Sequence, residues 1–175
     1  PDGVTSINAA AFHGCTSLTS ISIPDSVVSI LQSSFRNCSS LTSISIPDGI
    51  TTIAQRAFNG CSSLASVTIP DDVTSIEQYA FQGCTSLATV SILGIVSTVG
   101  QYAFQNCPSL THIELQTTPT TIGTSAFALG TSSRPVTCTV ESPGNAANGA
   151  FNSYKNNYTT FTYHGIGEYI GSDGL

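Results

Sequence analysis

Charged residues are scarce in this chain of 175 residues: Asp, Glu, Lys and Arg together make up 8% of it, against roughly 25% in an average globular domain. The sequence has only four basic residues, Arg36, Arg56, Arg134 and Lys155, and its formal net charge is −6. Binding to nucleic acid or to an anionic membrane surface requires clustered Lys and Arg. The composition therefore disfavours both of these functions.

Long apolar runs are also missing, as are Met and Trp. No stretch approaches the roughly 20 consecutive apolar residues that a transmembrane helix needs, so we expect no membrane span within this sequence. No targeting segment is recognisable. Because the chain starts at a proline inside a repeat pattern and contains no Met, we expect it to be part of a longer chain or of a larger assembly.

Known catalytic motifs are absent as well: GxSxG, HExxH, the P-loop and GxGxxG do not occur. His13, His112 and His164 lie far apart in the sequence. No CxxC pair, which would indicate a zinc site, occurs. We therefore predict that the protein is not an enzyme and that it uses no cofactor or metal.

A pattern of 23 residues repeats along the chain. The units are 1–23, 24–46, 47–69, 70–92 and 93–115, followed by a degenerate unit at 116–135. A position number from 1 to 23 counts from the first residue of a unit. Position 12 is Phe in all six units, position 7 is Ile or Val, and position 18 is Leu in the first five. One unit cannot bury these side chains alone, but stacked units can bury them against their copies, as in a leucine-rich-repeat solenoid.

Each unit divides into recognisable segments. Positions 18–23, as in "LTSISI", alternate between Ile and Ser and predict a β-strand, with Pro and Asp turning the chain after it. "VTSI" predicts a second short extended piece. "NAAAF", "AQRAF" and "EQYAF" predict a short helical turn, closed at position 14 by Gly or Asn. The expected class is therefore α/β, with a parallel sheet on one face and helical turns and extended pieces on the other.

Cysteine recurs at position 15 in five units: Cys15, Cys38, Cys61, Cys84 and Cys107. These residues form either a file of buried thiols or disulfides between neighbouring coils. Five equivalent cysteines cannot all pair, and their Cβ vectors point in parallel, so we favour the thiol file. Cys138 is off this register and is predicted to be a separate core residue.

These residues carry a family resemblance. The unit "AFxGCSSLxSVTIPDxVTSI" resembles the BspA-type leucine-rich repeat over residues 1 to about 135, although unit 5 has Leu93-Gly94 in place of Pro-Asp. Residues 136–175 resemble the family's C-terminal cap and tail, with a strand at "VTCTV", a proline turn, a short helix carrying Tyr154 and a closing strand at "TTFTYHG".

The resemblance implies a non-enzymatic recognition or adhesion module, extracellular or at the cell surface, that binds a protein or glycan partner through the solenoid surface. The alternative is a structural scaffold or spacer within a larger assembly, which the low charge and the absence of a catalytic site also fit.

Two surfaces are candidates for recognition. The first consists of the outward residues of the predicted strands: Ser43, Ser45, Ser66, Thr68, Thr89, Ser91, His112 and Glu114. The second comprises Arg56, Tyr79 and Tyr102, which all occupy position 10. The preceding position 9 is Gln in four units. Tyr and Arg are typical of interface hot spots. Solvated strands also favour Ser and Thr without any partner, and stacked tyrosines also cover neighbouring coils.

Two further features have alternative explanations. Asn37 and Asn157 lie in Asn-X-Ser/Thr sequons and are possible glycosylation sites, of which Asn157 is the better acceptor. A file of Asp25, Asp48 and Asp71 could attract calcium, but turn chemistry explains these aspartates without a metal.

Overall fold

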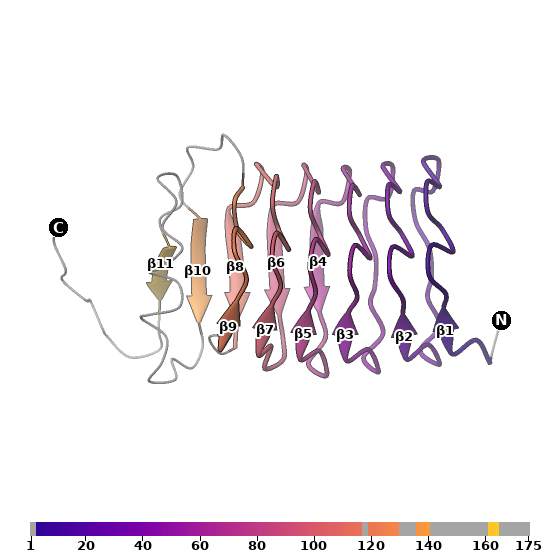
Figure 1. Cartoon of the computed structure of the whole chain (residues 1–175), viewed down its shortest axis with the longest axis horizontal. Coiled ribbons are helices and arrows are strands. Elements are labelled where there is room, and N and C mark those ends of the chain that lie inside the picture. The colour runs from indigo at the N-terminus through magenta and orange to yellow at the C-terminus, as the bar shows by residue number, and fades with distance from the viewer. Residues whose placement is uncertain (1–2, 117–118, 130–135, 141–160, 165–175) are drawn as a thin grey trace, which may run out of the picture.

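The computed structural model describes residues 3–116, 119–129, 136–140 and 161–164, the last two ranges as backbone only. Coils of the chain are stacked in a row along the long axis of the molecule (Figure 1). Each of the six coils contributes one two-residue strand: β1 (Ser6–Ile7), β2 (Ser29–Ile30), β3 (Thr52–Ile53), β5 (Ser75–Ile76), β7 (Thr98–Val99) and β9 (Thr121–Ile122). The longer strands are β4 (Ser66–Ile69), β6 (Thr89–Ile92), β8 (His112–Leu115), β10 (Val136–Val140) and β11 (Phe161–His164).

All described strands pair in parallel. The longer ones form one sheet in the order β11-β10-β8-β6-β4, and the short ones form a second sheet, β3-β5-β7-β9, and the pair β1-β2. Ser66 pairs with Thr89, and Thr89 pairs with His112, so each residue lies beside its own copy 23 positions away. This register confirms the predicted solenoid. In the first two units, the segments at positions 20–23 do not form assigned strands.

The core is a set of side-chain columns that run along the axis. The phenylalanine rings at position 12 stack from Phe12 to Phe127 with centroids between 5.1 and 5.5 Å apart and planes within 10° of parallel. Position 18 continues the core with Leu41, Leu64 and Leu87, which are fully buried. Stacking each side chain on its copies removes both of its faces from water, as the repeat pattern predicts.

The predicted helical turns are wrong: the residues that the structure describes contain no helix. Positions 8–15 form consecutive tight turns instead, in which the N–H of His13 bonds the carbonyl of Ala10 and the N–H of Cys15 bonds that of Phe12. The N–H groups at positions 10, 12 and 14 donate to the following coil, as Ala10 does to Gln32. Because these N–H groups point along the solenoid axis, they cannot make the i→i−4 bonds of an α-helix.

The backbone conformation of positions 10 and 14 also prevents a helix in this segment. Position 14 has positive φ in the first five units, for example +75° at Gly60 and +60° at Asn37, as its Gly and Asn residues predict. Position 10 also has positive φ in all six units, although it never holds Gly: the residues are Ala10, Ser33, Arg56, Tyr79, Tyr102 and Ser125. The left-handed residue at position 10 ends any right-handed helical turn after one or two residues.

Unit 5 departs from the repeat for a structural reason. The N–H of Leu93 donates to the carbonyl of Ile69 at 3.0 Å, a bond that the proline of the other units could not make. A Cβ atom at Gly94 would collide with the backbone of Asp71, so an Asp at this position would not fit. Leu-Gly therefore permits a closer backbone approach between units 4 and 5 than Pro-Asp would.

The strands expected at "VTCTV" and "TTFTYHG" are present in the backbone as β10 and β11, which continue the sheet beyond β8. The proline turn and the short helix carrying Tyr154 lie outside the described residues. That residues 136–175 act as a cap therefore stays a prediction.

Candidate recognition surfaces

The strand face is formed by the outward side chains of β4, β6 and β8. Ser66, Thr68 and Thr89 are exposed, and they lie in two columns that the register brings side by side. Ser43 and Ser45 are also exposed, but their segment is not an assigned strand. The expected alternation of outward hydroxyls is thus present, most regularly from unit 3 onward.

The character of the strand face changes at β8. His112 continues the column of Ser66 and Thr89, and Glu114 continues that of Thr68 and Ser91. The Ser91 hydroxyl donates to Oε2 of Glu114 at 2.9 Å, and both side chains are half-buried. This face offers mainly hydroxyl groups, with one carboxylate and one imidazole at the β8 end.

The second surface, which we call the turn face, consists of the outward side chains at positions 9, 10 and 13. Its centre is a three-membered stack: the Arg56 guanidinium carbon lies 4.7 Å from the centroid of the Tyr79 ring, and the Tyr79 and Tyr102 rings lie 5.2 Å apart at 13°. All three side chains are half-buried. The structure therefore brings together the three residues that the sequence singled out for this face, as a cation–π and aromatic stack.

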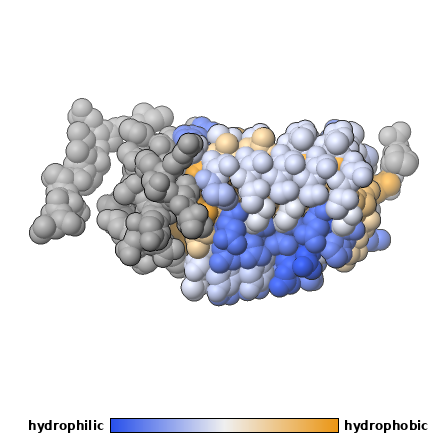
Figure 2. Space-filling model, turned by 90° about the horizontal axis from the view of Figure 1, so that it is seen from above, coloured by the Kyte–Doolittle hydropathy of each residue, from blue (hydrophilic) through white to orange (hydrophobic). Residues whose placement is uncertain are grey.

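Two ladders of side-chain amides run along the same turn segments, at positions 9 and 13. At position 9, the side-chain amide of Gln55 donates to Gln78 at 3.1 Å, and Gln78 donates to Gln101 at 2.9 Å. At position 13, Asn59 donates to Gln82 at 2.9 Å, and Gln82 donates to Gln105. Strongly hydrophilic residues gather in a band along one side of the solenoid (Figure 2). The glutamines of position 9 were recognisable from the sequence. Position 13 was not predicted, although aligning the units by 23 residues reveals its Asn and Gln residues.

The two arginines of the described residues both lie on the turn face. Arg36 is at position 13 and Arg56 at position 10 of the next coil; Arg36 was not predicted as a site residue. Neither forms an ion pair within the described part of the chain, and the Nε of Arg36 is buried there without an acceptor. Glu77 is the one described acid at the neighbouring position 8, and its Oε2 accepts the backbone N–H of Gln55 at 2.7 Å.

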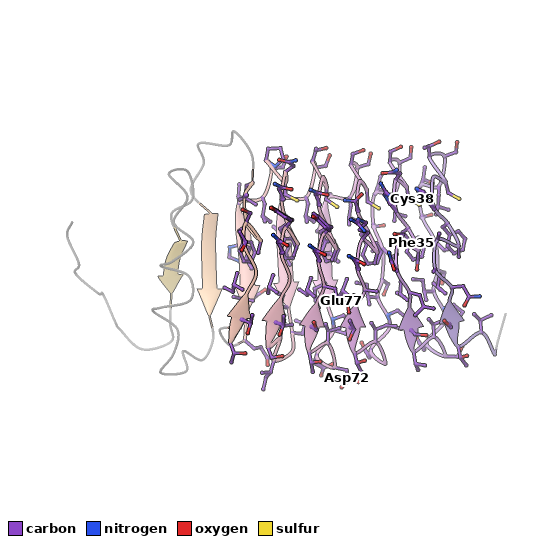
Figure 3. The ribbon with its side chains drawn as sticks, in the orientation of Figure 1. Phe35, Cys38, Asp72 and Glu77 are labelled. Carbon is purple, nitrogen blue, oxygen red and sulfur yellow. The ribbon has the colours of Figure 1, made fainter. Side chains whose placement is uncertain are left out.

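Most described carboxylates lie on a different edge of the solenoid. Asp25, Asp48, Asp71 and Asp72 are exposed at positions 2 and 3, directly after the strands. Asp72 lies at the lower edge of the stack, whereas Phe35 and Cys38 lie in the upper half (Figure 3). No group of three or more His, Cys, Asp or Glu side chains in the described ranges is close enough to hold a metal ion.

The cysteines form the expected file of thiols. Cys38, Cys61, Cys84 and Cys107 are buried, Cys15 is exposed, and all five are free. Each buried thiol donates to the carbonyl of the phenylalanine one coil earlier, as Cys61 does to Phe35 at 3.1 Å. The backbone of Cys138 is in register with Ile113, at position 21, so Cys138 does not continue the file.

Burial controls the acidity of these thiols. Loss of water raises the pKa of Cys61 to about 12, helped by the neighbouring Cys38 thiol, although a hydrogen bond from the Cys38 backbone opposes the shift. Burial also raises the pKa of Cys107 to about 12. The inner thiols are therefore neutral and unreactive at physiological pH.

Of the two sequons, only Asn37 lies in the described residues. It is exposed at position 14 with a φ of +60°, and its neighbour Cys38 is completely buried. Asn157 lies outside the described residues, so use of either sequon stays a prediction. No helix long and apolar enough to cross a bilayer occurs among the described residues.

Comparison with known proteins identifies the repeat. The model of the BspA type Leucine rich repeat region matches the chain in six copies, over residues 5–134 and 51–172. The crystal structure of the leucine-rich repeat protein TpLRR of T. pallidum is similar with a TM-score of 0.60 and 28% identity, covering 79% of this chain and 69% of that one.

A leucine rich cell surface protein of Faecalibacterium prausnitzii A2-165 is similar with a TM-score of 0.54 and 32% identity over 78% of this chain. The match covers 43% of that protein, so the chain corresponds to less than half of its length. No curated protein matches the sequence. The 23-residue register, the stacked phenylalanines and the family match together establish that the chain belongs to the BspA-type leucine-rich repeat family.

Proposed function

We propose that this chain is a non-enzymatic recognition or adhesion module that acts at a cell surface and binds a protein or glycan partner through the outside of its solenoid. One observation carries this proposal: the inward positions of the repeat are constant, whereas the outward positions vary. Position 12 is always Phe, but position 10 changes from Ala or Ser to Arg and Tyr, and the strand columns change from Ser and Thr to His112 and Glu114. A fixed core that carries a variable surface suits recognition.

Two further facts support the proposal. The chain is 32% identical, over 78% of its length, to a protein described as a leucine rich cell surface protein, which supports the same location for this chain. Pairs of Tyr and Arg side chains that are half-exposed and held by their neighbours supply contact area at a low entropic cost.

The proposal is tested by placing a photo-crosslinking residue at Thr68 on the strand face and, separately, at Tyr79 on the turn face, in cells of the native source. We expect one position to capture a specific partner at the cell surface and the other to capture little. The purified partner should then bind the chain saturably, and outward substitutions on the capturing face should weaken that binding. Absence of a surface-located partner for both positions would favour the spacer alternative.

A further inference from the structure

We propose that the turn face binds a glycan bearing carboxylate groups, such as a uronic or sialic acid, with Arg36 and Arg56 holding the carboxylate and Tyr79, Tyr102 and the amide ladders holding the sugar rings. The inference rests on the proposed function and deepens it by naming the surface and the chemical class of the ligand.

The aromatic stack is not required by the fold. Position 10 holds Ala10, Ser33 and Ser125 in three other coils with the same positive φ, so small residues satisfy the backbone there. Tyr79 and Tyr102 adopt φ values of +61° and +59°, which are unfavourable for bulky side chains. Residues that keep a strained backbone conformation without filling the core indicate selection for a surface role.

The amide ladders leave hydrogen-bonding capacity that matches sugar hydroxyls. Gln78 accepts one bond from Gln55 and donates one to Gln101 along the axis. A primary amide has two N–H donors and two lone pairs, so one donor and one lone pair of Gln78 remain for a ligand. A hydroxyl group also donates and accepts, which makes it complementary to such an amide.

The two arginines give this surface a positive charge that can pair with an anionic ligand. They lie on neighbouring coils, form no ion pair within the described residues, and include a buried Nε without an acceptor. Arginine binds carboxylate through paired N–H groups, so a single sugar carboxylate would supply the missing acceptor. The four exposed aspartates lie at positions 2 and 3, directly after the strands. The one described acid beside the turn face, Glu77 at position 8, already accepts the N–H of Gln55, so the two arginines outnumber the carboxylates here.

Composition favours a glycan over a protein. In units 3–5, positions 8, 9, 10 and 13 contain no aliphatic side chain larger than Ala. Tyr and Arg are enriched in protein interfaces too, but the fully buried centre of such an interface is more apolar than this surface, which lacks large aliphatic side chains. Among the described residues, Tyr102 is followed at position 10 by Ser125, whose side chain is smaller than an aromatic ring. A tyrosine ring can stack on the apolar face of a sugar.

The test measures binding of defined oligosaccharides by isothermal titration calorimetry. The probes are a glucuronate-containing hexasaccharide, the same hexasaccharide with its carboxyl groups reduced to alcohols, and sialyllactose; poly-glutamate serves as a non-glycan anion. The variants Arg36→Asn, Arg56→Ser and Tyr102→Ser introduce residues that the repeat itself uses at those positions, so they are expected to fold. Thr68→Ala on the strand face is the matched control.

We expect one of the two acidic glycans to bind, and the better of them identifies the sugar type. Carboxyl reduction and each arginine variant should weaken binding about tenfold, and Thr68→Ala should leave it unchanged. Failure of both acidic glycans to bind, equal binding of the reduced hexasaccharide, or equal binding of poly-glutamate would overturn the inference. A partner captured through Thr68 alongside such a failure would leave the proposed function intact.

Discussion

Phe12 and Phe58 hold the same position of the repeat and stack on their neighbours in the same way, yet Phe58 is completely buried and Phe12 only partly. Cys15 and Cys61 differ similarly, since Cys15 is exposed and Cys61 is buried. Phe58 is covered by Phe35 and Phe81, whereas Phe12 has a described ring, Phe35, on one side only. The local sequence thus determines which side chains point inward, and the adjacent coils determine how much of each is buried.

The largest expected effect is on the aromatic column. Phe58→Ala should lower the free energy of unfolding by about 3–5 kcal/mol, because it leaves a cavity between two fixed rings. In a protein made of these 175 residues alone, Phe12→Ala should cost about 1–2 kcal/mol, because part of that side chain is then in water. Urea unfolding of both variants measures the difference, and equal losses would contradict the dependence on neighbouring coils.

A second prediction reverses the usual effect of restoring a consensus sequence. Replacing Leu93-Gly94 by Pro-Asp, the residues at 70–71, should destabilise the chain by about 2–3 kcal/mol. The change removes the N–H that bonds Ile69 and adds a Cβ where the backbone of Asp71 lies. Leu93→Ala with Gly94 retained is the control, which should keep the hydrogen bond and most of the stability.

The thiol file gives a prediction about pH. The pKa of Cys61 and Cys107 is about 12 in the folded chain and near 9.0 in the unfolded chain. Because the folded pKa is the higher one, stability should be unaffected below pH 9 and should fall between pH 9 and pH 12. Each thiol should contribute about 1 kcal/mol of loss by pH 10.

Thermal unfolding of Cys61→Ala and the parent across this pH range would reveal the contribution of one thiol. At neutral pH, in a protein made of these 175 residues alone, an alkylating reagent should modify Cys15 in the folded state and the four inner thiols only after unfolding. Rapid modification of Cys61 in the native state would refute this difference between the coils.

The smallest effect on stability is expected on the turn face. Tyr79→Ser should change the free energy of unfolding by less than about 0.5 kcal/mol, because Ser occupies this position in two other coils. Thermal denaturation of Tyr79→Ser and of Phe58→Ala would compare the loss of an aromatic side chain that points outward with the loss of one that points into the core. A loss comparable to that of Phe58→Ala would mean that the tyrosine stack supports the fold rather than recognition.

The sequence predicted the features that depend on the period. The 23-residue repeat places Phe58 beside Phe81 and Ser66 beside Thr89, and both contacts are present. The prediction of a helical turn at positions 8–15 was wrong. "AQRAF" has the composition of a helix, but the hydrogen bonds that prevent a helix are made to the next coil. Composition alone carries no signal of those bonds, since their donors and acceptors lie about 22 residues apart.

The candidate site was predicted only in part. Arg56, Tyr79 and Tyr102 were recognised because they share position 10. Arg36 was missed, because it belongs to position 13 of the preceding unit and meets this face only when the coils stack. The left-handed backbone at Tyr79 was missed too, because such geometry is normally signalled by Gly or Asn.

The lateral bonds at positions 10, 12 and 14 have an electrical consequence. At each of the five junctions between coils, three N–H groups donate toward the later coil and three carbonyls point toward the earlier one. Peptide dipoles aligned in this way add along the axis instead of cancelling, as they largely do in a β-sheet. Along the described coils, the segments at positions 9–14 therefore direct their carbonyls toward the first coil and their N–H groups toward the last. This polarity is opposite in sense to that of an α-helix, and each added coil lengthens the field.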